Sequence, residues 1–169
     1  MGTWVDAATA LITAAEGTEV PALEGSGTTT IGAIVSRSFL APGPDFATDC
    51  SLLAVHVERI SGLPVGSDSA LGPDSCVLVP ALRLVLTYAQ DCAPAPTQKG
   101  KPPTPAEVEA WTVAWYEQTN ALWQAVADAV LGGPVGQECL DATIGDGVTS
   151  GPEGLVVWFR IPVTVRLQA

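Results

Sequence analysis

The sequence holds few of the side chains that usually carry enzymatic chemistry. It contains a single histidine, His56, and four cysteines, none of which forms a C-x-x-C pair. A nucleophilic hydroxyl or thiol needs a base beside it, and His56 is expected on the solvent side of a strand, with no G-x-S-x-G turn in the chain. These residues favour neither a catalytic triad nor a zinc site. We therefore expect that the protein is not an enzyme.

The cysteines lie next to polar residues at the expected ends of elements; they are Cys50, Cys76, Cys92 and Cys139. For a chain made in a cytoplasm we expect reduced, partly buried thiols. Their positions at loop ends leave disulfides as the alternative, with three possible connectivities. If the strands expected over 51–60 and 77–89 pair antiparallel, Cys50 and Cys92 come near each other.

Two groups of carboxylates could in principle bind a metal ion or act as an acid–base pair, but their spacing favours structural roles. Asp141, Asp146 and Glu153 lie in a glycine-rich segment without the one-three-five ligand spacing of an EF-hand, and we interpret them as a solvated turn. Glu107 and Glu109 lie in the first turn of an expected helix, where they complement the helix dipole. The chain has no glycine-rich loop with the following Lys-Ser or Lys-Thr of a phosphate site. We predict neither a metal nor a cofactor.

Composition limits the classes of protein that the chain can belong to. Its 169 residues suit one domain over 1–169, and 47% apolar against 15% charged residues exclude a disordered chain. Eighteen acidic and seven basic residues give a formal charge of −11, which argues against a reader of nucleic acid. We expect no signal peptide at the start and no membrane span, because no run reaches about 18 apolar residues.

Two helix starts are the strongest local patterns. Thr3 with Asp6 three residues later predicts a short helix over 3–16. Thr104-Pro105-Ala106-Glu107 combines an N-cap, a proline at the first helical position and a capping glutamate. The helix that follows is expected to end at Gly132-Gly133-Pro134, so its roughly 27 residues would span about 40 Å. Its apolar stripe comprises Val108, Trp111, Trp115, Leu122, Val126 and Ala129.

The remaining patterns are typical of strands over 28–40, 51–60, 77–89 and 155–167. They predict an α+β fold in which a mostly antiparallel sheet of about four strands is packed by one long helix and a short N-terminal helix. Exposed loops are expected over 61–76 and 93–104. Pro80 and Pro162 lie inside strand patterns, so each should mark an edge or a bulge.

Alternation along 155–167 directs Trp158, Arg160 and Arg166 outward, away from the apolar core. Four of the five arginines lie in expected strands, so positive charge concentrates on the sheet of an acidic protein. We predict that this face or its edge contacts acidic loops of a neighbouring subunit. The acidic residues considered are Asp45, Asp49, Asp68 and Asp74. The alternative is a solvated sheet face.

This element order resembles that of the tail-terminator proteins of long-tailed bacteriophages, over roughly residues 3–167. The composition, rich in Ala, Val, Gly and Pro, looks like that of phages of actinobacteria. The resemblance implies a ring, commonly a hexamer, that caps the tail tube and joins it to the neck of the virion. It further implies assembly in the host cytoplasm and passage of DNA without specific binding. Another neck or head-completion adaptor, or a small non-enzymatic binding module, is the alternative.

Overall fold

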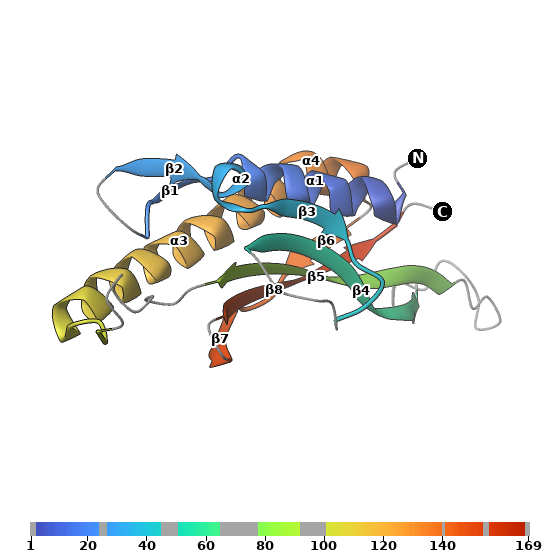
Figure 1. Cartoon of the computed structure of the whole chain (residues 1–169). Coiled ribbons are helices and arrows are strands. Elements are labelled where there is room, and N and C mark those ends of the chain that lie inside the picture. The colour runs from blue at the N-terminus through green and yellow to red at the C-terminus, as the bar shows by residue number, and fades with distance from the viewer. Residues whose placement is uncertain are drawn as a thin grey trace.

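The computed structural model describes residues 3–23, 27–44, 51–64, 78–91, 101–139, 141–153 and 156–167. The helices are α1 (Trp4–Glu16), α2 (Ile31–Ile34), α3 (Pro105–Leu131) and α4 (Pro134–Glu138). The strands are β1 (Glu19–Pro21), β2 (Thr28–Thr30), β3 (Arg37–Leu40), β4 (Leu52–Pro64), β5 (Leu78–Asp91), β6 (Asp141–Ile144), β7 (Val148–Glu153) and β8 (Val156–Arg166). Helices form one layer over one face of the main sheet (Figure 1).

The main sheet has the strand order β3-β4-β5-β8-β6, and β7 also pairs with β8. Only β3 and β4 pair in parallel among the described strands, so the predicted α+β fold with a mostly antiparallel sheet is confirmed. The predicted number of about four strands is too low, because six strands form this sheet and β1 and β2 form a separate ribbon. The missed strands are three to six residues long, too short to show a clear alternation.

The single strand predicted over 28–40 is wrong. This segment instead forms β2, the short helix α2 and β3. Thr30 starts α2, because its hydroxyl accepts a hydrogen bond from the backbone N–H of Ala33 at 3.3 Å. A Cβ atom at Gly32 would lie 3.1 Å from the carbonyl oxygen of Glu16, so glycine lets α2 approach α1 closely. The Thr30 cap and the close packing at Gly32 therefore favour a helical turn in a segment whose β-branched residues favour a strand.

Strands β6 and β7 run one after the other along the same side of β8. β6 pairs with the end of β8 and β7 with its start, while residues 145–147 between them are not paired as a strand. The carbonyl of Pro162 accepts a hydrogen bond from Gly145 N–H at 2.8 Å. In antiparallel strands the carbonyl and the N–H of one residue point to the same side, so the N–H that Pro162 lacks would also point toward residues 145–147. Asp141 and Glu153 thus lie in strands, which corrects the interpretation of them as part of a solvated turn. Asp146 lies in the exposed segment between the two strands.

The two prolines in the strand patterns take different positions. Pro162 lies in an inner strand and opposite Val85, which corrects the expectation of an edge or a bulge. Pro80 lies opposite Gly62, one residue beyond the last pair that β5 makes with β8. Pro80 therefore lies beyond the part of β5 that pairs with β8, and Pro162 lies between the parts of β8 that pair with β6 and with β7. At both positions a missing N–H is tolerated.

Both predicted helix starts are confirmed. Thr3 and Asp6 form a capping box on α1, and Thr104 and Glu107 form the same arrangement on α3. These hydrogen bonds lower the pKa of the Asp6 and Glu107 carboxyls below their ordinary values. Helix α3 has the expected 27 residues and ends before Gly132. Of its predicted apolar stripe only Val108 is exposed.

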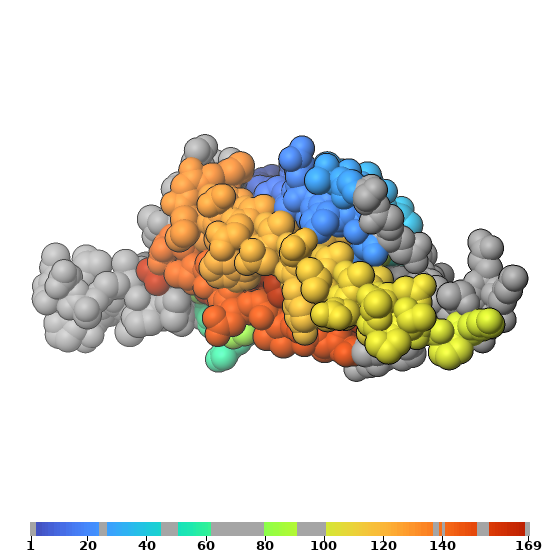
Figure 2. Space-filling view, turned by 90° about the vertical axis from the view of Figure 1, so that its left-hand side faces the viewer, coloured from blue at the N-terminus to red at the C-terminus, as the bar shows by residue number. Residues whose placement is uncertain are grey.

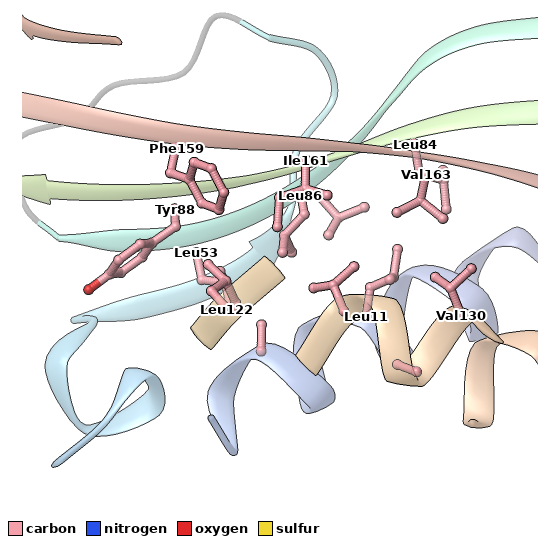
Figure 3. Close-up of a cluster of buried hydrophobic side chains, with 14 of the residues drawn as sticks. Leu11, Leu53, Leu84, Leu86, Tyr88, Leu122, Val130, Phe159, Ile161 and Val163 are labelled. Atoms are coloured by element: carbon pink, nitrogen blue, oxygen red, sulfur yellow. The ribbon is translucent and has the colours of Figure 1, made fainter. Parts of the chain in front are cut away.

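The core fills the space between the helices and the sheet. Leu11 of α1 and Val130 of α3 extend toward Leu84 and Val163 of the sheet, as Figure 3 shows. Trp111 stacks on Trp115 with ring centroids 5.9 Å apart, and Trp115 stacks on the ring of Tyr88 at 5.6 Å. The indole rings predicted to face the core are buried there.

The predicted loops fall only partly on described residues. Residues 61–64 extend β4, so the loop expected over 61–76 begins later than predicted, and the remainder lies outside the described residues. Of the loop expected over 93–104, residues 101–104 are described and lead into α3. Cys139 is buried, and the other three cysteines lie outside the described residues. In the described part of the chain no helix has the length and apolarity needed to cross a membrane.

Candidate assembly interface

The main sheet has one face against the helices and one face without them, here called the open face. Strand register places the side chains, because paired residues on neighbouring strands point to the same side of a sheet. Leu53, Leu84 and Ile161 point into the helix-covered core. Their sequence neighbours belong to the open face. No described helix lies over that face (Figure 1).

All five arginines of the chain lie on the open face, and we call this set the arginine face. Arg37 is in register with Leu52, Arg59 with Arg83, and Arg166 with Ala81. Each of these positions belongs to the same side of the sheet. The members of the arginine face are Arg37, Arg59, Arg83, Arg160 and Arg166. All except the half-buried Arg166 are exposed.

A β-bulge shapes the charged end of this face. The register of β4 against β5 shifts between Val57 and Arg59, which leaves Glu58 as an extra residue. Arg83 Nε donates a hydrogen bond to Glu58 Oε2 at 2.6 Å, and both side chains are about half exposed. Arg59 lies directly opposite Arg83 on the neighbouring strand. Like charges placed opposite each other in a sheet are destabilising, so one acidic side chain partly offsets two cations.

Aromatic rings hold two of the arginines in place. The guanidinium of Arg160 lies 5.3 Å from the ring centroid of Trp158, and that of Arg37 lies 5.4 Å from the ring of Phe39. Both rings pack against a small apolar cluster on the open face that includes Ala54. Cation–π contacts leave the guanidinium N–H groups able to donate to a partner. Both arginines are therefore held at defined positions on the open face.

The prediction that His56 is solvated is wrong. Its side chain is only 3% exposed, on the open face opposite Val85. Burial lowers the pKa of His56 below its ordinary value; Glu58 acts in the opposite direction and Arg160 lowers it further. His56 Nδ1, Thr87 Oγ1 and Arg166 Nε are buried polar atoms without a hydrogen-bond partner among the described residues. All three belong to the open face.

A groove of about 370 Å³ crosses the open face beside β6 and β7. Arg83 and Arg160 line it together with Glu58, and Val85 and Pro162 provide apolar surface. Asp146 and Val148 contribute from the outer side of the sheet. The groove thus combines two arginines, two carboxylates and apolar surface, and Arg83 is paired with Glu58 within it. Such a surface suits a segment that presents both carboxylates and apolar side chains.

The helical layer has the opposite charge. None of the four helices contains a Lys, Arg or His residue. They carry seven acidic residues, namely Asp6, Glu16, Glu107, Glu109, Glu117, Asp128 and Glu138. The helical layer therefore carries only acidic charge, whereas all five arginines lie on the opposite sheet face. That face also holds carboxylates, among them Glu58 beside Arg83 and Asp141 in register with Arg166.

The structure brings together Trp158, Arg160 and Arg166 on the open face, where alternation along β8 predicts them. Asp45, Asp49, Asp68 and Asp74 lie outside the described residues. Sequence reasoning counted Arg59, Arg83, Arg160 and Arg166 as the arginines of the sheet and missed Arg37, whose place on this face follows from the register of β3 with β4. Among the described residues no group of three or more His, Cys, Asp or Glu side chains is arranged to hold a metal.

Comparisons with known proteins find similarity among solved structures alone. No protein-family model matches the chain, and no curated protein sequence is similar to it. A chain of a solved structure described as the virion of a native gene transfer agent particle has a TM-score of 0.43 and 11% sequence identity. The match covers 82% of this chain and 84% of that chain.

Proposed function

We propose that this protein is a structural component of a phage virion, a tail terminator that forms a ring on the tail tube and joins it to the neck. The observation that carries the proposal is that the helices hold acids and no cation, while all five arginines gather on the open face of the sheet. A subunit with opposite charges on different faces is suited to bind a copy of itself head to tail. Such heterologous contacts form a ring when the rotation between successive copies closes on itself, and an open filament when it does not.

The element order supports the same proposal. The short first helix, the long tryptophan-rich helix and the final strand, on which the resemblance to tail terminators rests, are all present. In the ring we propose, Trp158, Arg160 and Arg166 contact the neighbouring subunit, with Asp45, Asp49, Asp68 and Asp74 as candidate acidic counterparts. The resemblance suggests six copies, an actinobacterial host and assembly in its cytoplasm. Another neck or head-completion adaptor is the alternative within this class, and a small binding module is the alternative outside it.

The acidic composition suggests how DNA would pass through such a ring. Six copies at −11 each carry a formal charge of −66. A channel lined by part of this charge repels phosphates, so DNA slides through without specific binding. The arginine face, buried between subunits in this arrangement, does not reach the DNA.

Negative-stain electron microscopy of the purified protein, alone and mixed with tail tubes that lack a terminator, tests the proposal. We expect rings that bind one end of the tubes. Rings that bind only isolated neck or connector complexes would favour the adaptor alternative. Monomers or dimers at micromolar concentration, with bare tube ends, would contradict the ring and favour a binding module.

A further inference from the structure

We propose that the outward side of α3 binds the arginine face of the next copy. This inference rests on the proposed ring and names the surface that completes it. We call the outward side the α3 stripe. Its members are Glu109, Val113, Tyr116, Glu117, Asp128 and Leu131.

Helical spacing creates the stripe. Its residues recur at intervals of three or four along α3, or at sums of such intervals, so they share one side of the helix. Trp111, Trp115 and Leu122 occupy the opposite side and are buried in the core. The stripe therefore runs nearly the full length of a helix of about 40 Å. It is long enough to cross several strands of a neighbouring sheet, since strands lie about 4.8 Å apart.

The stripe exposes more apolar surface than a solvated helix face requires. Leu131 is 75% exposed, Tyr116 58% and Val113 52%. Glu109 and Glu117 border Val113 and Tyr116, and Asp128 lies beside Leu131. Exposed Asn120 and Gln124 lie between these two groups, and no cation lies on α3. Exposed apolar residues arranged in a row and bordered by polar groups are typical of a protein-binding surface.

The arginine face offers the matching chemistry. The groove beside β6 and β7 presents Arg160, the Arg83–Glu58 pair and apolar surface at Val85 and Pro162, and Asp146 also lines it. Arg37 and Arg59 add further cations to the same face. Carboxylates of the α3 stripe can bind the guanidinium groups, while Val113 and Tyr116 cover the apolar surface. Helix α3 is thus complementary to the open face both in charge and in apolar character.

The positions of the two surfaces favour a ring over a straight stack. In Figure 2 helix α3 crosses the visible flank of the molecule diagonally, from its yellow start to its orange end, between the blue α1 above and the red β7 and β8 below. The open face lies on the underside of the sheet in Figure 1. Because the two surfaces are not directly opposed, each contact rotates the next copy relative to the last. A ring forms when this rotation closes, as the proposed function requires.

Charge exchange between the two surfaces tests the inference. One variant carries Arg59→Glu and Arg160→Glu, a second carries Glu109→Lys and Glu117→Lys, and a third carries all four changes. All four side chains are exposed, so circular dichroism should show a folded chain in each case. Sedimentation velocity at low salt then reports the mass of each variant alone, and of an equal mixture of the first two.

When each of the first two variants is measured alone, we expect its mass to be at least fivefold lower than that of the wild-type ring. Their mixture and the four-change variant should recover ring-sized assemblies, because opposite charges face each other again. If only the arginine variant fails to assemble, the α3 stripe is not the surface that binds the arginine face, and the inference is overturned. The proposed ring would stand, with another acidic surface binding the arginines. A wild-type protein that is itself monomeric would overturn both. Loss of DNA binding as the only effect of the arginine changes would assign the face to nucleic acid instead.

Discussion

Arg59 and Arg83 lie directly opposite each other on β4 and β5, and Arg83 Nε donates a hydrogen bond to Glu58 Oε2 at 2.6 Å. Two like charges in register destabilise a sheet. The one carboxylate supplied by the β-bulge offsets only part of this repulsion. In the ring that we propose, carboxylates of a neighbouring copy supply the remainder, so the arrangement is unfavourable in the free subunit and favourable in the assembly.

Arg59→Thr should stabilise the free subunit while weakening self-association. Threonine suits a strand and removes the repulsion, so we expect a gain of about 0.5 kcal/mol in the free energy of unfolding. Urea titration of dilute protein measures this change. Arg37→Thr is the matched control, because Arg37 lies opposite Leu52 and should give no such gain. Equal effects of the two substitutions would contradict the role of the Arg59–Arg83 repulsion.

Trp115→Ala should destabilise the fold by about 3–5 kcal/mol, because it removes a buried ring that stacks on Trp111 and Tyr88. Such a loss is a large part of the stability of a domain. The neighbouring and exposed Tyr116→Ala should change the free energy of unfolding by less than about 0.5 kcal/mol. Thermal unfolding of both variants compares them, and an unchanged melting temperature for Trp115→Ala would contradict the described packing.

Gln118→Leu should loosen the β1–β2 ribbon more than the main sheet. Tyr88 Oη donates to Gln118 Oε1 at 2.9 Å, and Gln118 Nε2 donates to the carbonyl of Pro21 at 2.6 Å. Leucine keeps the volume but removes the donor to the partly buried Pro21 carbonyl and the acceptor of the Tyr88 hydroxyl, at a cost of about 1–3 kcal/mol. The Tyr88 hydroxyl still accepts a hydrogen bond from Gln90 Nε2 at 2.6 Å, so the larger loss is at the ribbon. Hydrogen exchange should accelerate at Val20 and Thr29, with little change in β5. Uniform acceleration would argue against a specific link to the ribbon.

The stability of the subunit should fall as the pH drops from 7 toward 5. Because burial lowers the pKa of His56 in the folded chain, the unfolded chain binds a proton first, near pH 6.5. The stability that depends on neutral His56 is thus complete above pH 6.5 and is lost as the pH falls through the folded pKa. Urea unfolding across this range should show the loss, and His56→Gln should remove it. The capping carboxylates titrate lower, below their ordinary values near 4, so a slope that persists in His56→Gln between pH 5 and 7 would contradict the assignment.

Strong local patterns made much of the helical layer predictable from sequence. Thr104 and Glu107 define the start of α3, and a 3.6-residue period identifies Trp111 and Trp115 as core residues. Long alternation likewise predicts that Arg160 and Arg166 share one face of β8. These features depend on neighbours in the chain, so periodicity reveals them.

Features set by contacts between distant residues were not predictable. The parallel pairing of β3 with β4 depends on register between Arg37 and Leu52, which no local pattern encodes. His56 occupies a polar position in an alternating strand, yet its surroundings on the sheet bury it. The grouping of all five arginines on one face emerges only when the register of β3, β4, β5 and β8 is known.

The central claim, that the arginine face joins copies of this protein, is tested most directly by the mass of Arg160→Gln/Arg166→Gln in solution. The control is Lys101→Glu, which changes the net charge by the same two units at a residue outside the arginine face. We predict that, at low salt, wild type and the control sediment at several times 17.3 kDa, while the arginine variant dissociates. An arginine variant with the same mass as wild type would contradict the account.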